Sequence, residues 1–541
     1  MSFIQDAPRL GNQFTGDPLL QRWLRWRLPD HAFGEIVEGL HALGGRVVGD
    51  IAQYAADAEA NPPQLRHFDA WGNRADTIVM ADGWQKLHAA AATEGIIATA
   101  YEQSQGEYSR AHQFARLYLF HPSSALYSCP LAMTDGAASV LLQLGSRQLA
   151  QRVVRRLTSR VPEEFWTSGQ WMTETAGGSD VSNTGTVAHP DGDGYRLAGH
   201  KWFSSAATSE IALTLAQLDG RLSLFYLETR NKDGSLNGIT IERLKDKLGT
   251  RAMPTAELAL QGTRARLLGE PGHGVRNIAG MLNITRLYNS VCAVASMRRG
   301  LALARDYAHR RTAFGRPLIG HVLHRETLAN LEAHYQSAFH LVFHLGLLLG
   351  KAEAGVASDA EQLLLRLMTP VTKLYTARLA VASASEVLEC FGGAGYIEDT
   401  GLPKLLRDAQ VLPIWEGTTN VLSLDASRVL QRQPAAMEAF VSDVYGRLAG
   451  DDRELAPARR HINDGMGRLR VLPADSEADA RELAFGLARV YAASLMYECV
   501  AAHPAWQVSR AALEWTVQRT LVGPWAQPGT LAAADILARQ R

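Results

Sequence analysis

The stretch from Val411 to Arg428, VLPIWEGTTNVLSLDASR, places one carboxylate between a large aromatic side chain and a glycine. Glu416 is the candidate base, because Trp415 offers an apolar wall that would desolvate the carboxylate and strengthen it as a base. Gly417 removes side-chain bulk, which lets a ligand approach the backbone. A Glu before a Gly, taken alone, is more often an exposed turn, so the rest of the chain has to support the assignment. Short polar side chains suited to cofactor contacts follow: Thr418, Thr419 and Asn420.

Four further segments combine glycines with short polar or basic side chains. In chain order they are CPLAMTDGAA at 129–138, MTETAGGSD at 172–180, RTAFGRPL at 311–318 and ECFGGAGY at 389–396. Together with the Glu416 segment they resemble, in order and content, the acyl-CoA dehydrogenase family over about residues 125–428. The N-terminal lead, the segment 61–74 and the tail beyond Arg428 resemble one branch of that family, the alkylation-response (AidB-type) flavoproteins.

This resemblance implies an FAD enzyme in which Glu416 is the catalytic base. It also implies that Arg311 and Phe314 reach the FAD of a neighbouring subunit, in a homotetramer built as a dimer of dimers. Glu389 departs from the family pattern, which often has Gln there, and an ionised carboxylate cannot donate a hydrogen bond. The family's cofactor contacts match this chain at Thr173, Gly178, Ser179, Trp202, Phe203, Ser204, Ser205, Arg311, Phe314, Gly393, Trp415, Thr418 and Asn420.

Two further positions bear on the catalytic prediction. Some family members carry the base on another helix, where this chain has Thr285, and threonine cannot serve as that base. Arg428 matches an arginine that enters the active-site cavity in the AidB-type branch. Its charge would weaken Glu416 as a base and take up room needed by an acyl chain. This predicts weak turnover limited to short or branched acyl groups, or no physiological turnover at all. The alternative for Arg428 is a surface arginine that caps a helix C-terminus.

Periodicity predicts the elements that must position these residues. An α+β fold is expected, with an N-terminal helical domain at 1–162, a β-domain at 163–272, a four-helix bundle at 273–436 and a helical extension at 437–541. The resemblance implies that the β-domain is barrel-like and binds the flavin, and that the bundle carries Glu416 and makes the oligomer interface. Within the first domain, Pro62 and Pro63 end a helix, and the polar and aromatic segment that follows them is predicted to be a loop. Alternating runs such as GYRLAGHKWFSS and IALTLAQL predict an antiparallel sheet in the second domain.

Composition restricts the classes of function. The 541 residues carry 55 basic and 55 acidic side chains, so no global field draws the protein to DNA or to an anionic membrane. The four cysteines lack metal-ligand or redox spacing, and no metal is expected. No secretory signal is recognised, and no uninterrupted apolar run approaches the roughly 20 residues of a membrane span. A cytoplasmic protein is expected. The GxGxxG fingerprint is absent, so a nicotinamide cofactor is not indicated.

Three functions compete at this level. The first is an FAD-dependent acyl-CoA dehydrogenase acting on a small acyl thioester, with an electron-transfer partner to reoxidise it. The second, suggested by the branch resemblance, is a DNA-binding flavoprotein that protects or repairs alkylated DNA. The span 437–541 holds 12 arginines, no lysine and 13 acidic residues, a net charge of −1, so tail composition does not support DNA binding. The third is a structural oligomer in which FAD stabilises the fold.

Overall fold

The computed structural model describes residues 6–450, 452–521 and 537. Its contacts divide the chain into two compact units, and each unit combines stretches that are distant in sequence. The first unit comprises Met1–Gly45, Gln105–Tyr118 and Asn289–Arg541, and the second comprises Arg46–Ser104 and Leu119–Tyr288. The helices of the predicted N-terminal domain are therefore shared between the two units. The four-domain division stays a prediction.

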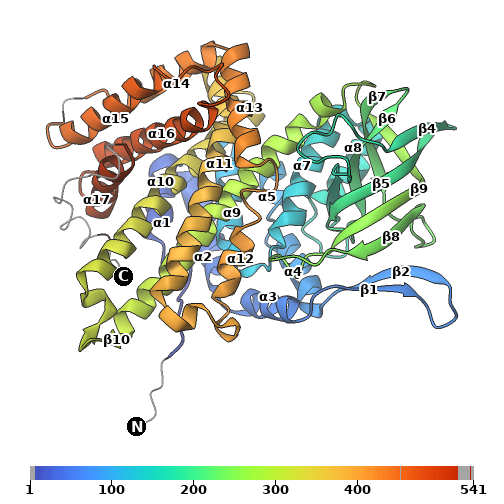
Figure 1. Ribbon diagram of the computed structural model, residues 1–541, viewed down its shortest axis with the longest axis horizontal. Helices are drawn as coiled ribbons and strands as arrows, with labels where there is room; N and C mark the ends of the chain where they lie inside the picture. The colour runs from blue at the N-terminus through green and yellow to red at the C-terminus, as the bar shows by residue number, and fades with distance from the viewer. Residues whose placement is uncertain (1–5, 451, 522–536, 538–541) are drawn as a thin grey trace, which may run out of the picture. The chain divides into compact units, whose positions relative to one another are not determined.

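A single seven-stranded sheet dominates the second unit. The strands run in the order β3-β6-β4-β5-β9-β7, and β8 pairs with β9. Most of these strands are labelled in Figure 1. Alternate side chains such as Trp171, Leu197 and Phe225 form its core. Asp219 and Gly220 both have positive φ, 50° and 70°, which gives the two-residue turn that joins β6 to β7 with the right twist. The strands are β3 (Ser168–Trp171), β4 (Val187–Asp191), β5 (Gly194–Ser205), β6 (Ile211–Leu218), β7 (Arg221–Glu228), β8 (Ile239–Leu244) and β9 (Thr255–Leu268).

The expectation of a purely antiparallel sheet is wrong for β6. This strand pairs in parallel with β3 along four residues and with β4 at one position, while the other pairings in the sheet are antiparallel. Parallel neighbours need a long connection, and the chain between β3 and β6 supplies one because it includes β4 and β5. Alternation of apolar side chains predicts a strand but does not encode the direction of its neighbour.

The segment predicted as a loop forms a β-hairpin. Strands β1 (Gln64–Phe68) and β2 (Arg74–Val79) pair antiparallel across a tip that includes Trp71, which is 89% exposed. Asp76 joins this hairpin to β8, because its carboxylate accepts a hydrogen bond from the amide of Ile241 at 3.1 Å. The second unit also contains α3 (Asp50–Ala60), α4 (Asp82–Thr93), α5 (Ala98–Glu102), α7 (Ser128–Leu144) and α8 (Arg147–Leu157).

Long helices form the body of the first unit. Three of them have 37, 32 and 32 residues, and the fourth of the predicted bundle, α13, has 14. Ser358 and Glu361 form a capping box that starts α11. The helices are α1 (Pro18–Arg27), α2 (Asp30–Arg46), α6 (Ser109–Phe120), α9 (Gly274–Arg310), α10 (Val322–Glu353), α11 (Asp359–Cys390), α12 (Pro403–Ala409) and α13 (Thr419–Arg432), and the first turns of α9 belong to the second unit.

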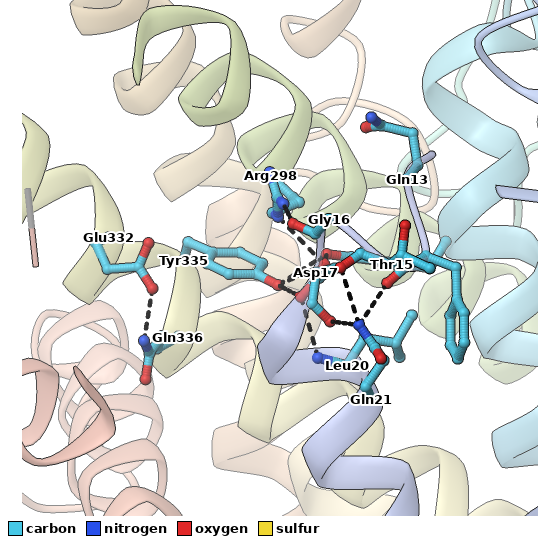
Figure 2. Close-up of polar contacts among 12 residues, drawn as sticks. Gln13, Thr15, Gly16, Asp17, Leu20, Gln21, Arg298, Glu332, Tyr335 and Gln336 are labelled. Atoms are coloured by element: carbon cyan, nitrogen blue, oxygen red, sulfur yellow. Dashed lines mark hydrogen bonds and ion pairs between the residues drawn. The ribbon is translucent and has the colours of Figure 1, made fainter. Parts of the chain in front are cut away.

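A buried carboxylate ties the start of the chain to this bundle (Figure 2). Asp17 is 2% exposed and caps α1 by accepting from the amide of Leu20 at 3.0 Å. Its Oδ2 also accepts from the hydroxyl of Tyr335 at 3.1 Å and lies 3.2 Å from the guanidinium of Arg298. One side chain therefore joins α1 to both α9 and α10.

The C-terminal extension is helical and packs together as one group, drawn in orange to red in Figure 1. Its helices are α14 (Ala435–Arg447), α15 (Ala456–Leu469), α16 (Ala480–Ala502) and α17 (Gln507–Thr516). Helix α16 is long and apolar enough to cross a membrane, but 78% of its apolar window is buried in the structure, as in the core helix of a globular unit. Arg447 contacts Glu498 at 3.1 Å, and Glu498 in turn binds Arg27 of α1 at 3.1 Å. This bridge anchors the extension to α1.

Candidate functional site

Glu416 lies in a turn between α12 and α13, and its backbone adopts the left-handed region with φ of 61°. Residues other than glycine rarely adopt this conformation, so the surroundings must hold it there. The amide of Trp415 donates to the carbonyl of Val411 at 2.9 Å and closes the turn that precedes Glu416. The side chain is partly buried, and its Oε2 atom is out of contact with solvent.

Gly417 has a structural reason beyond the predicted approach of a ligand. Its φ of 102° is disfavoured for residues with a side chain. A Cβ atom at this position would lie 2.9 Å from Cδ2 of Leu422 in α13. The glycine therefore lets the turn lie directly against the helix that follows.

Two buried side chains hold the turn from other helices. Lys373 of α11 is 0% exposed, and its Nζ donates to the carbonyl of Gly417 at 2.7 Å. Asn289 of α9 is 1% exposed, and its Nδ2 donates to the carbonyl of Leu412 at 3.1 Å. The backbone on both sides of Glu416 is thus fixed by polar contacts to the bundle.

The polar residues after Glu416 lie at the start of α13. Thr418 is the N-cap of this helix, but its side chain makes no capping hydrogen bond. Asn420 is exposed, and its Oδ1 accepts from Arg481 of α16 at 3.0 Å. Arg428 is exposed on α13, whose buried face includes Leu422 and Val429. The predicted roles of Thr418, Asn420 and Arg428 stay predictions.

Arg311 and Phe314 belong to a short hairpin after α9. Its strands are β10 (Thr312–Ala313) and β11 (Arg316–Pro317), and the two turn residues, Phe314 and Gly315, have φ of 49° and 78°. This geometry is a tight hairpin turn that places Phe314 at the tip, where it is 95% exposed. Arg311 is partly buried at the base of the hairpin.

Gly393 lies in a short 3₁₀ turn, Gly392–Gly395, that follows α11. A Cβ atom at Gly392 or at Gly393 would meet nothing within 4 Å, so the space beside this backbone is open. The predicted close approach of a cofactor to Gly393 is compatible with that space.

In the second unit the predicted cofactor residues lie on two segments that touch. The amide of Trp202 donates to the carbonyl of Thr173 at 2.8 Å, which joins the MTETAGGSD segment to β5. Gly178 packs over Thr173, because a Cβ there would lie 2.9 Å from Thr173 Cγ2. Ser179 is exposed beyond the turn. The structure thus brings the two predicted segments together.

Lys245, the first residue after β8, contacts one side of the Trp202 ring. The Nζ of Lys245 lies 3.2 Å from the centre of the Trp202 ring and 4.7 Å from that of Phe203. Glu257 accepts from Lys245 at 2.5 Å, so the ammonium is fixed in this position. Phe203 is 51% exposed. A cation of this kind stabilises an aromatic ring by about 0.5–2 kcal/mol and restricts its rotation.

Ser204 provides a test of whether the segment fits a cofactor. Its side chain is 0% exposed, and among the residues that the structure describes no hydrogen-bond partner contacts its Oγ. A buried hydroxyl without a partner costs free energy, so an external group that bonds to it is expected. Ser205 already has a contact, with Thr255 at 3.3 Å. The hydroxyl of Ser204 therefore fits the FAD that the sequence implies.

Thr285 is excluded as an acid–base group by its own contacts as well as its chemistry. Its hydroxyl is buried and donates to the carbonyls of Met281 and Leu282 in α9, at 3.1 Å each. Within the described parts of the chain no group of three or more His, Cys, Asp or Glu side chains is arranged to hold a metal ion.

Sequence reasoning missed the residues that support the site. Lys373 and Asn289 lie far from Glu416 in sequence, and nothing in their local pattern predicts their contacts with its turn. Glu174 and Lys201 could have been identified from the sequence, because they are the immediate neighbours of the predicted cofactor contacts Thr173 and Trp202. The position of Lys201 directly before Trp202 and Phe203, inside a predicted cofactor segment, is the feature that could have found it.

Four family models match consecutive parts of the chain. They are described as "Adaptive response protein AidB N-terminal domain" at residues 7–163, "Acyl-CoA dehydrogenase, middle domain" at 169–263, "Acyl-CoA dehydrogenase, C-terminal domain" at 272–431 and "Acyl-CoA dehydrogenase 11 C-terminal domain-like" at 435–527.

Two curated proteins and two solved structures extend these matches. Acyl-CoA dehydrogenase family member 11 of Caenorhabditis elegans is 45% identical over 92% of this chain and 85% of its own length. The putative acyl-CoA dehydrogenase AidB of Escherichia coli is 35% identical over 76% of each. The C. elegans ACDH-11 structure in complex with C11-CoA has a TM-score of 0.90 and 42% identity, covering all of this chain and 93% of that one. The apo-form of Bd2924 has a TM-score of 0.87 and 49% identity, covering 92% and 99%.

Proposed function

Since the chain belongs to the acyl-CoA dehydrogenase family, a family of FAD-dependent oxidoreductases, we propose that it removes two hydrogens from the α- and β-carbons of an acyl-CoA thioester. The observation that carries this proposal is the Glu416 turn. A carboxylate with one oxygen out of solvent is held there on a fixed backbone, in the segment that matches the family's catalytic base.

Glu416 takes the proton from the α-carbon, and the fixed turn holds it in position to do so. A positioned general base contributes about 10²- to 10⁴-fold to such a step. FAD held at this site would supply the hydride acceptor for the β-carbon. In the second unit, the hydroxyl of Ser204 and the backbone at Gly178 are the groups that would hold it. Lys245 holds the ring of Trp202, a predicted cofactor contact, from one side.

The acyl chain is the part of the substrate on which two observations differ. The ACDH-11 structure was solved with C11-CoA, which favours a chain of that length for a relative 42% identical. Arg428 predicts a short or branched acyl group. Titration with butyryl-, isovaleryl- and undecanoyl-CoA separates the two, and Arg428→Ala extends the accepted length only if the arginine enters the cavity.

A neighbouring subunit completes the site in this proposal. Phe314 is almost fully exposed at the tip of a short hairpin, with Arg311 at its base, and such a tip suits insertion into another molecule. Assembly as a homotetramer is proposed on this basis, and sedimentation of the purified protein tests it.

The alternative is a flavoprotein that binds DNA through the C-terminal extension. Three arginines of α15 and its end make contacts within the extension itself: Arg459 donates to the carbonyl of Gly450, Arg468 to that of Leu521 and Arg470 to the hydroxyl of Tyr445. These contacts hold the three guanidinium groups against the extension, and the net charge of −1 across 437–541 gives the extension no excess of positive charge for phosphates. A salt-dependent gel shift with duplex DNA would instead support the alternative.

The test of the proposed reaction is anaerobic titration of the purified protein with the acyl-CoA panel. Loss of the oxidised flavin absorbance is expected with at least one of them. Glu416→Gln should keep FAD but abolish this bleaching, whereas Glu438→Gln, at an exposed carboxylate of α14, should behave as wild type. If no acyl-CoA bleaches the wild-type flavin, the proposed reaction is wrong.

A further inference from the structure

An ion pair is buried in the second unit beside the predicted cofactor residues. The side chain of Lys201 is 0% exposed and that of Glu174 is 9% exposed, and Nζ lies 2.7 Å from Oε1. Lys201 precedes Trp202 on β5, and Glu174 follows Thr173. The pair therefore lies next to the hydrogen bond between the Trp202 amide and the Thr173 carbonyl.

Both charges are fully engaged. The Lys201 ammonium also donates to the carbonyl of Leu215 on β6 at 2.9 Å. Glu174 accepts from the amide of Gly185 at 2.6 Å and from the hydroxyl of Thr186 at 2.6 Å. Burial raises the pKa of the Glu174 carboxyl, but the charge of Lys201 and these hydrogen bonds outweigh burial, and the pKa lies below its ordinary value. The carboxylate is thus ionised at neutral pH.

Glu174 also shapes the glycine-rich turn through its backbone. Its amide donates to the carbonyl of Gly177 at 3.0 Å, and the amide of Gly177 donates back to the carbonyl of Glu174 at 3.1 Å. Glu174 therefore contacts three parts of this region. They are the turn that carries Gly178 and Ser179, Thr186 directly before β4, and Lys201 on β5. The close approach of Thr186 to β5 depends on Gly199, where a Cβ would lie 2.4 Å from Thr186 Oγ1.

A buried ion pair is an inefficient way to add stability. Desolvating two charges offsets much of their attraction, and apolar residues of similar volume often serve stability as well or better. What a pair with many hydrogen bonds does provide is a single allowed geometry, because each alternative arrangement leaves a buried charge without a partner. The pair lies between two predicted cofactor segments, so the geometry that it fixes is that of these segments.

We infer that Glu174 and Lys201 are positioning residues, which hold the segments Thr173–Ser179 and Trp202–Ser205 in the one register that binds FAD. The inference rests on the proposed function, since it requires that these segments bind FAD. It predicts that the pair governs cofactor affinity and geometry more than it governs the stability of the fold.

The test compares variants of the FAD-loaded protein by three measurements. The FAD dissociation constant is obtained from free-flavin fluorescence on dilution, and visible circular dichroism reports the geometry of bound flavin. The thermal midpoint at saturating FAD reports stability. The key variant is the double change Glu174→Gln with Lys201→Met, which removes both charges together. The control is Leu197→Ala on the same strand, which opens a cavity in the sheet core without touching the pair.

Either single change should lower both the thermal midpoint and FAD affinity, because it leaves a buried charge uncompensated. The double variant should recover most of the thermal midpoint and still bind FAD at least about tenfold more weakly, with an altered flavin dichroism. Leu197→Ala should lower the midpoint and leave the dissociation constant within about twofold. FAD affinity within about twofold of wild type in a recovered double variant overturns the inference.

If the double variant does not recover its thermal midpoint, Thr186→Val tests the positioning role instead. It replaces a buried hydroxyl with a methyl group and removes one donor to Glu174 while both charges remain. Weaker FAD binding than in Leu197→Ala, despite a smaller loss of thermal midpoint, supports a positioning role, and the reverse order contradicts it. A colourless wild-type protein that binds no FAD contradicts the proposed function itself and is distinguished from these outcomes at the first step.

Discussion

Lys373→Met tests whether the turn around Glu416 is held for catalysis. The wild-type ammonium is completely buried and donates to the carbonyl of Gly417, the residue directly after the proposed base, at 2.7 Å. Methionine has a similar length and no charge, so it fills the same space in α11 and cannot make that bond. The turn is then free to relax from the left-handed conformation of Glu416.

The size of the effect follows from the contact that is lost. A hydrogen bond to a charged group contributes about 1.5–3 kcal/mol. If this free energy serves to place the Glu416 carboxylate, turnover falls by about ten- to 150-fold, since each 1.36 kcal/mol corresponds to a factor of ten. The loss should appear in kcat rather than in KM, because Lys373 supports the base and not the substrate.

The assay is steady-state dehydrogenation with an artificial electron acceptor, using the acyl-CoA that bleaches the flavin best. The control is Lys351→Met on α10, where the lysine contacts Glu361 at 2.7 Å and is 37% exposed. The same chemical change at this partly exposed pair should cost little, about 1 kcal/mol of stability or less, and leave kcat unchanged. A wild-type kcat for a folded, FAD-loaded Lys373→Met protein would refute the reasoning.

Three further predictions concern the fold. Burial lowers the pKa of His340 from 6.5 to about 3, so the folded state excludes a proton that the unfolded chain binds. The free energy of unfolding should therefore fall as the pH drops below 6.5, by up to about 1.4 kcal/mol per pH unit. In urea titrations, the free energy of unfolding of His340→Phe should depend less steeply on pH than that of the wild type. Gly417→Ala should cost about 1–3 kcal/mol through its φ of 102° and its contact with Leu422, measured as a lower thermal midpoint together with reduced turnover. Asp17→Ala leaves Arg298 without this partner and should cost about 3–5 kcal/mol in urea unfolding, and an effect below 1 kcal/mol would contradict the network in Figure 2.

Local patterns predicted local structure well. The run GYRLAGHKWFSS is β5 and IALTLAQL is β6, because alternation and the flanking turns are properties of neighbouring residues. Pairing direction was not predicted, since β6 lies parallel to β3 across a connection that includes two other strands. The hairpin β1–β2 was missed for a related reason: its strands of five and six residues are too short and too polar to show a clear alternation.

At the candidate site, too, local sequence predicts local features but not the contacts between distant segments. The position of Glu416 could be predicted from its neighbours, Trp415 and Gly417, because they are adjacent in sequence. Its left-handed backbone and the contact from Lys373 could not, since they arise from packing between α11 and α13. Whether Arg428 approaches the base also depends on packing, and that part of the prediction awaits the acyl-CoA panel.

Asp17 has a consequence for how the protein is made. A ribosome releases the chain from its N-terminus, and Asp17 emerges 318 residues before Tyr335, one of the groups that enclose it. The second unit ends at Tyr288, so it is complete before either α10 or α11 has been synthesised. In the first unit, α1 is synthesised early and cannot pack against its partner helices until the C-terminal part of the chain has been synthesised. The Asp17 carboxylate at the start of α1 tolerates this interval, because water can hydrogen-bond to it until Arg298 and Tyr335 have been synthesised and replace the water.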